Sequence, residues 1–189
     1  STEGEPLAAA KAAAQGFLED LAEVQANVVL VSFNDEATIA APMTTNLDAV
    51  ADAIDGLEAD GETALYDAIS LGASELGEID GQRTMVVFSD GANTVGDATL
   101  EQAVAASLAA EAPITTVVLA SPDLDVAALQ NLASASQGRS VTVDSTDELA
   151  GAFEGVAQQL TNQYVVSYSG AAVEASELDV EVTIALPSG

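Results

Sequence analysis

Three short segments of this chain bring together hydroxyl and carboxylate oxygens that could form a binding site. They are residues 1–4 (STEG), 60–63 (DGET) and 89–91 (SDG). The first two precede predicted helices, and the third follows a predicted strand. In open α/β sheets, ligands bind beyond the carboxyl ends of the strands, where loops of this kind lie. Hydroxyl and carboxylate oxygens are the ligands that Mg²⁺ or Ca²⁺ requires.

The chain contains neither cysteine nor histidine. Disulfides and thiolate metal sites are therefore excluded, and the commonest metal ligand and general base is absent. The sequence also lacks the G-x-G-x-x-G and P-loop motifs for phosphates and the G-x-S-x-G nucleophile motif. We predict that the protein is not an enzyme, with catalysis by a carboxylate pair as an open alternative, and that any metal is bound through oxygen.

Acidic residues outnumber basic ones by 31 to 3, which gives a formal net charge of -28 at pH 7. This charge repels a phosphate backbone, so it excludes nucleic acid and disfavours an anionic membrane surface. No segment approaches the roughly 20 apolar residues of a membrane span, and we predict no membrane insertion. The acids are spread along the whole chain, which favours adaptation to high salt over cation recruitment as their cause.

Predicted helices and strands alternate along residues 1–160. This alternation is typical of a doubly wound α/β fold, a mainly parallel sheet covered by helices on both faces. Apolar, β-branched runs such as NVVLVSF and RTMVVFS are typical of buried parallel strands. The predicted strands are residues 27–33, 37–41, 83–89, 114–120 and 140–143. The predicted helices are residues 5–21, 46–57, 63 onward, 99–110, 125–137 and 146–160.

The pattern changes after residue 160. Residues 163–169 (QYVVSYS) and 178–186 (LDVEVTIAL) alternate apolar and polar side chains, which predicts two half-exposed strands. We therefore divide the chain into an α/β domain over residues 1–160 and a two-stranded β extension over residues 163–189. The extension is expected to be part of an adjoining β region.

Four segments, in order, resemble those of a known family: EPLAAAKAAAQGFLEDL, VVLVSFNDEA with the PMT that follows, GETALYDAI, and VVFSDGANT. They are similar to the first helix, second strand, second metal loop and fourth strand of von Willebrand factor A domains. TALYDAI and the hydrophobic-Ser-Asp-Gly ending are weak signals alone but fairly specific as an ordered pair. The resemblance covers residues 1–160 and implies a Rossmann-like sheet.

The resemblance also implies a metal-ion-dependent adhesion site. The family forms it from a D-x-S-x-S loop after the first strand, a threonine in the second loop and an aspartate after the fourth strand. Carried over by position, the ligands are Ser1, as the last serine of the first loop, Thr63 and Asp90. In the family an acidic side chain of the protein ligand fills an open position on the metal, so a divalent cation, Mg²⁺ or Ca²⁺, bridges the two proteins.

The chain departs from the family pattern in two places. The family's first, central strand and the start of D-x-S-x-S have no counterpart before Ser1, so the sheet should have an empty slot in its middle with unpaired backbone groups. We expect that the chain is a fragment or that another segment donates this strand in trans. The second departure is Glu62, where relatives commonly have glycine; its carboxylate beside Thr63 would strengthen the attraction of a cation.

Each candidate also has a plainer structural role. Asp90 could form an Asp-Gly turn, although the matching loops favour metal binding, and Thr63 could cap a helix while binding a metal. Asp35 and Asn93 are expected in solvated loops, and the alternative is that they lie behind the metal ligands and hold them in position. Tyr66 and Asp67 are expected to pack and cap.

The leading hypothesis is a metal-dependent protein-binding or adhesion module outside the cell or on its surface. The alternative is a metal-independent acidic scaffold or interaction domain of a larger surface or secretion-associated assembly. A location inside a high-salt cell also stays open, because related domains serve intracellular metal-chelatase and ATPase machines.

Overall fold

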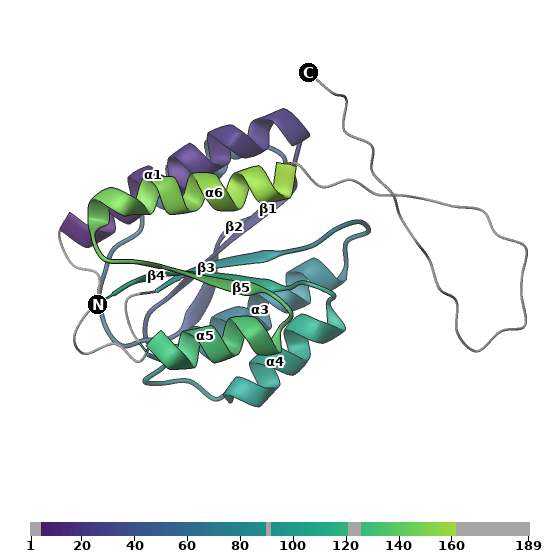
Figure 1. Cartoon of the computed structure of the whole chain (residues 1–189). Coiled ribbons are helices and arrows are strands. Elements are labelled where there is room, and N and C mark those ends of the chain that lie inside the picture. Colours follow the sequence, from purple (N-terminus) through teal and green to yellow (C-terminus); the bar gives the residue numbers. More distant parts are fainter. Residues whose placement is uncertain (1–4, 90–91, 121–125, 162–189) are drawn as a thin grey trace, which may run out of the picture.

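The computed structural model describes residues 5–89, 92–120 and 126–161 as strands between two layers of helices (Figure 1). One helical layer contains α1, α2 and α6, and the other contains α3, α4 and α5. The helices are α1 (Glu5–Leu21), α2 (Leu47–Asp55), α3 (Leu65–Gly77), α4 (Leu100–Ala109), α5 (Val126–Ala135) and α6 (Leu149–Thr161), with short 3-10 helices at Ala22–Val24 and Thr146–Glu148. The strands are β1 (Val28–Phe33), β2 (Ala37–Thr44), β3 (Met85–Ser89), β4 (Ile114–Leu119) and β5 (Arg139–Val143).

Two of the predicted helices, over residues 46–57 and 99–110, have a side-chain cap at their first predicted residue. The Asn46 side chain accepts a hydrogen bond from the backbone N–H of Ala49 at the start of α2. Thr99 and Gln102 form a reciprocal capping box at the start of α4. Such caps satisfy backbone donors that the first helical turn leaves without a partner.

Strands β3, β4 and β5 form a parallel sheet in that order, with Met85 opposite Ile114 and Thr115 opposite Arg139. Strand β4 lies between two partners and is covered by helices on both faces. Its residues Ile114, Val117 and Val118 are fully buried. The α/β fold predicted from the sequence, with a parallel sheet flanked by helices, is confirmed for this part of the molecule.

Strands β1 and β2 form a separate two-stranded antiparallel ladder, with Phe33 opposite Ala37 and Val28 opposite Thr44. The ladder is irregular between Val28 and Val31. The sequence predicted β1 as a buried parallel strand. That prediction was wrong, because β1 is half-buried along its whole length and its only partner in the described chain is antiparallel.

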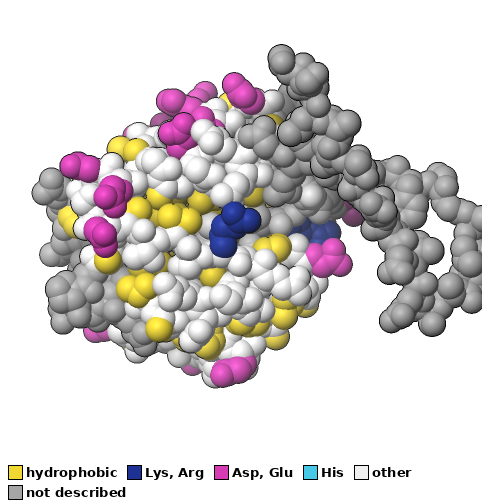
Figure 2. Space-filling model, in the orientation of Figure 1, with side chains coloured by type: hydrophobic (Ala, Val, Ile, Leu, Met, Phe, Trp, Pro, Cys, Tyr) yellow, Lys and Arg dark blue, Asp and Glu magenta, His cyan; other side chains and the backbone are white. Residues whose placement is uncertain are grey.

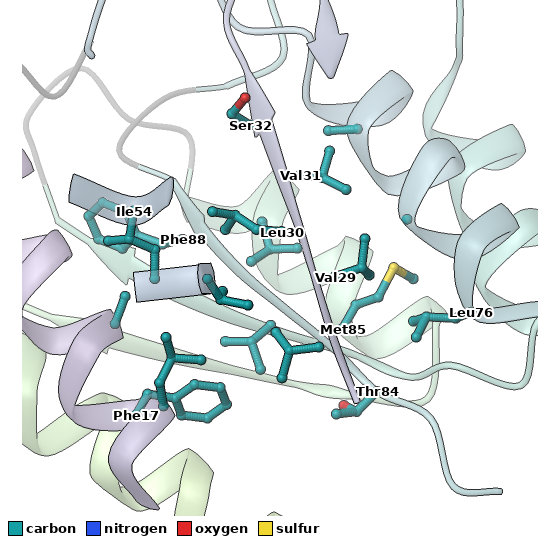
Figure 3. A pocket seen from close by; sticks show the side chains of 18 of the residues that line it. Phe17, Val29, Leu30, Val31, Ser32, Ile54, Leu76, Thr84, Met85 and Phe88 are labelled. Atoms are coloured by element: carbon teal, nitrogen blue, oxygen red, sulfur yellow. The ribbon is translucent and has the colours of Figure 1, made fainter. Parts of the chain in front are cut away.

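A slot separates these two sheets. No ladder of hydrogen bonds joins β1 to β3 in the described part of the chain. Between them lies a cavity of about 650 Å³, lined by both strands and by helices of both layers (Figure 3). This is the gap that the family resemblance predicts in the middle of the sheet. The two predicted strands of residues 163–189 lie outside the described residues, and none of the described helices has the length and apolar character needed to cross a membrane.

Candidate metal-binding edge

Three loops meet at the edge where β1 and β3 end. The loop after β1 contacts the loop before α3, since the carbonyl of Asn34 accepts a hydrogen bond from the backbone N–H of Ala64 at 2.8 Å. The loop before α3 in turn contacts the loop after β3 through Thr63 and Thr94. Because both strands end at this edge, β1 and β3 run in the same direction.

Thr63 is held in place through its backbone. Its N–H donates to Oγ1 of Thr94 at 2.9 Å, and its carbonyl accepts from the N–H of Thr94 at 2.9 Å. The Thr63 side chain is half-buried and lines the slot together with Ser89, the last residue of β3. Its hydroxyl has no hydrogen-bond partner among the residues that the structure describes, which leaves the oxygen available as a metal ligand.

Thr63 does not cap α3, so the capping role considered for it was wrong. Ala64 is the N-cap residue and makes no side-chain cap bond. The side chain of Asn93, from the loop after β3, takes that role by accepting the backbone N–H of Tyr66 at 3.0 Å. The amide nitrogen of Asn93 also donates to the carbonyl of Val95 at 2.9 Å. Asn93 is therefore a half-buried link between β3 and α3 rather than a solvated loop residue.

Asp67 fixes the far end of the loop after β3. Its carboxylate accepts the backbone N–H groups of Asp97 at 3.0 Å and Ala98 at 2.8 Å. Gly96 has a positive φ of 109° and packs so closely on this carboxylate that a Cβ there would collide with it. The sequence predicted Asp67 to pack and cap, but no motif indicated that it would organise a loop about 30 residues further along the chain.

Asp35 has a similar but more exposed role. Its carboxylate accepts the backbone N–H of Glu62 at 2.7 Å and lies against Gly61, which has a φ of 77°. A side chain at Gly61 would collide with Asp35 and would also be strained by the backbone conformation. Asp35 therefore shapes the loop that carries Glu62 and Thr63, and the carboxylate of Glu62 is exposed beside Thr63.

Of the three predicted metal ligands, Thr63 lies in the described part of the chain. Ser1 and Asp90 lie outside it, so their roles as metal ligands stay predictions. Within residues 5–89, 92–120 and 126–161, no group of three or more His, Cys, Asp or Glu side chains is arranged to hold a metal ion.

The fold and this loop edge define the class of protein. An open α/β sheet with polar loops gathered beyond the carboxyl ends of its strands is a ligand-binding architecture. Residues 1–93 match the sequence model of the von Willebrand factor type A domain. Residues 1–93 are therefore identified as part of a von Willebrand factor type A domain, and domains of this type bind protein partners.

Several solved structures share this fold at low sequence identity. The conserved hypothetical protein BatB from Bacteroides thetaiotaomicron has a TM-score of 0.71 and 18% identity, and the match covers 85% of this chain and 90% of that chain. The vWF domain of the type V pili tip protein Mfa5 from Porphyromonas gingivalis has a TM-score of 0.70 and 13% identity, over 88% and 94% of the two chains. A von Willebrand factor type A protein from Catenulispora acidiphila has a TM-score of 0.71 and 16% identity, over 80% of this chain and 37% of that one. A search of the curated proteins found no match.

Proposed function

We propose that this domain binds a protein ligand through a divalent cation held at the loop edge by Ser1, Thr63 and Asp90. The observation that carries this proposal is the position of the Thr63 hydroxyl, which lies at the mouth of the slot and forms no hydrogen bond with the described residues. Hydroxyl and carboxylate donors fit a hard cation such as Mg²⁺ or Ca²⁺. A carboxylate of the ligand would complete the coordination, and the domain itself would not be an enzyme.

The described residues of the surrounding loops support the proposal because side-chain hydrogen bonds hold them in place. Asp35, Asn93 and Asp67 hold the three loops by side-chain hydrogen bonds to backbone groups. These residues would act behind the metal ligands and fix their positions, as supporting shells do in metal sites. Glu62 adds an exposed negative charge that would raise the local concentration of cations.

The alternative function is an acidic interaction domain that needs no metal. Acidic side chains are scattered over the face in Figure 2 and do not gather in one patch there. That distribution favours salt adaptation as the origin of the charge, whichever function holds. We place the protein outside the cell or on its surface, in line with the pilus tip protein among its structural neighbours, with a high-salt cell interior as the other setting.

Calorimetric titration of Mg²⁺ and of Ca²⁺ into the chain, at constant ionic strength, tests whether the chain binds a divalent cation. We expect one saturable site that Thr63→Ala and Asp90→Ala each remove. Thr45→Ala is the matched control, because Thr45 is an exposed threonine next to Thr44, which pairs with the opposite end of β1. Saturable binding that survives both site substitutions, or no binding at all, would favour the metal-independent alternative.

A further inference from the structure

We propose that Asp60 is a site of spontaneous chemical modification, at which the Asp60–Gly61 peptide isomerises to isoaspartate. The backbone nitrogen of Gly61 attacks Cγ of the Asp60 carboxyl group, and the amide hydrogen and the carboxyl OH leave together as water. A second water then opens the cyclic imide at either carbonyl. Opening at the backbone carbonyl gives isoaspartate, in which the main chain runs through Cγ.

The geometry places the reacting groups of Asp60 and Gly61 next to each other. The backbone N–H of Gly61 donates to Oδ1 of Asp60 at 2.9 Å, so the carboxyl group is folded back onto the nitrogen that attacks it. Groups that are already held close together react faster than groups that must first meet. Both residues are exposed, so water reaches the imide, and Gly61 has no side chain to hinder the attack.

The Asp55–Gly56 pair has the same sequence but the opposite geometry. The N–H of Gly56 donates to carbonyls of α2, those of Asp52 and Ile54. Oδ1 of Asp55 accepts a hydrogen bond from Nε2 of Gln15 on α1 at 2.7 Å. Because the nitrogen and the carboxyl group are each held by other partners, we expect this pair to react slowly.

The Asp80–Gly81 pair lies between these two cases. Both of its residues are exposed, Gly81 has a φ of 112°, and a Cβ there would meet nothing within 4 Å. Within the described chain, no hydrogen bond holds the Asp80 carboxyl group against the nitrogen of Gly81. The two groups must therefore meet by rotation of the side chain. A fourth pair, Asp90–Gly91, lies outside the described residues.

Isomerisation at Asp60 would change the loop that carries Glu62 and Thr63. It adds one carbon to the main chain just before two fixed points. The Asp35 carboxylate holds the N–H of Glu62 at 2.7 Å, and Oγ1 of Thr94 holds the N–H of Thr63 at 2.9 Å. We expect the longer main chain to break these bonds and to displace Thr63 from the mouth of the slot. A consequent loss of cation binding rests on the proposed function, whereas the isomerisation itself does not.

Ageing of the whole chain at neutral pH and physiological temperature, in water labelled with heavy oxygen, tests the chemistry. Each opening of the imide leaves one labelled oxygen in the aspartate or isoaspartate. Combined digestion after Glu and after Lys and Arg separates the described pairs, because residues 37–58, 59–62 and 79–83 each contain one Asp–Gly sequence. Mass spectrometry measures the label in each peptide, and electron-transfer fragmentation distinguishes the two linkages.

In the folded chain we expect residues 59–62 to take up label about tenfold or more faster than residues 37–58, and about threefold faster than residues 79–83. In the chain unfolded by urea, the three rates should agree to within about twofold, because the shared Asp–Gly sequence then sets them. The unfolded chain therefore separates the effect of the fold from the effect of the sequence.

Hydrogen exchange measures the structural consequence. The amides of Glu62 and Thr63 should exchange about tenfold faster in the aged chain than in the fresh one, since their acceptors are lost. Asp60→Glu keeps the charge but cannot form this imide, so its aged form should keep the slow exchange. Asp80→Glu is the matched control and should age like the natural chain. Calorimetric titration of fresh and aged chain adds the cation: a fresh chain that binds none contradicts the proposed function and leaves the isomerisation in place.

Three results would overturn the inference. Label uptake in residues 59–62 that is no faster than in residues 37–58 would show that Asp60 is not a preferred site. The same ratio of rates in folded and unfolded chain would show that the fold does not select it. Isoaspartate at Asp60 with unchanged exchange at Glu62 and Thr63 would show that the modification does not disturb this loop.

Discussion

Strands β4 and β1 have similar sequences but different surroundings. Both are apolar runs of six residues, ITTVVL and VVLVSF. Strand β4 has parallel partners on both sides and four of its residues are at most 1% exposed, whereas every residue of β1 is half-buried. Burial of such a run therefore depends on neighbouring strands as well as on its own hydrophobicity. Around β4 the strands are paired on both sides, and this half of the molecule is called the closed half. Around the slot, β1 and β3 each have a partner on one side in the described chain, and this half is called the open half.

The largest expected contrast comes from placing a charge in each half. Val117→Asp puts a carboxylate at a fully buried site of β4 and should lower the free energy of unfolding by more than about 4 kcal/mol. Val86→Asp, at a half-buried position of β3 beside the slot, should lower the free energy of unfolding by about 1–2 kcal/mol because water can reach the charge. Urea unfolding of both variants gives the difference. Equal losses would show that the slot is closed in solution.

Two glycines provide the next contrast. A Cβ at Gly138 would collide with the backbone of Ile114 in the closed half, so Gly138→Ala should lower the free energy of unfolding by about 3 kcal/mol. Gly72→Ala adds a methyl group that fits beside the slot, and it should stabilise α3 by up to about 1 kcal/mol. Gly77→Ala, with open space around its Cβ, controls for helix propensity. A destabilising Gly72→Ala would mean that the slot is already filled.

Substitution of two aspartates compares how much each contributes to the stability of the loops at the candidate site. Asp67 is half-buried and accepts two backbone N–H groups, so Asp67→Ala should cost about 2 kcal/mol. Asp35 is exposed and accepts one, and Asp35→Ala should cost about 0.5–1 kcal/mol. Thermal unfolding measures both, with exposed Asp52→Ala on α2 as the control. If Asp35→Ala destabilised the protein more than Asp67→Ala, Asp67 would not be the residue that contributes more to the stability of this edge.

The smallest effect is expected at Glu101 in the first turn of α4. A hydrogen bond from its own backbone N–H and one from the Thr99 side chain lower the pKa of this exposed carboxyl. Because the folded pKa is below the unfolded one, its contribution is present above the unfolded pKa and is lost as the pH falls through the folded pKa. NMR titration of the side chain should show the lowered pKa, and Thr99→Ala should raise it. An unchanged pKa in Thr99→Ala would contradict this cause.

The sequence predicted the elements well because its signals are local. The apolar runs, the Asn46 and Thr99 caps, and the order of helices and strands all follow from neighbouring residues. Gly138 directly follows the predicted helix over residues 125–137, but the positive φ of 63° is at Gln137 and not at the glycine. Gly138 is required because its backbone packs against Ile114, a contact between distant segments that no local pattern indicates.

The candidate site was predicted less completely. Family resemblance singled out Thr63, with Glu62 beside it as a departure from the family, whereas Asp35 and Asn93 were expected in solvated loops. The capping bond from Asn93 and the loop contacts of Asp67 join residues about 30 positions apart. Such pairs depend on how β1, β3 and α3 pack together. The antiparallel pairing of β1 with β2 follows from the short turn over residues 34–36 that joins them, because parallel strands need a much longer crossover.

The most direct test of a cation at the loop edge is thermal unfolding with and without millimolar Mg²⁺ or Ca²⁺ at fixed ionic strength. A cation that binds only the folded state at about 100 times its Kd adds about 2.7 kcal/mol. For a chain of this size that raises Tm by roughly 5–10 °C. We predict such a rise for the natural chain and for Thr45→Ala, and none for Thr63→Ala. The same rise in Thr63→Ala, or an unchanged Tm in every chain, would contradict a cation site at Thr63.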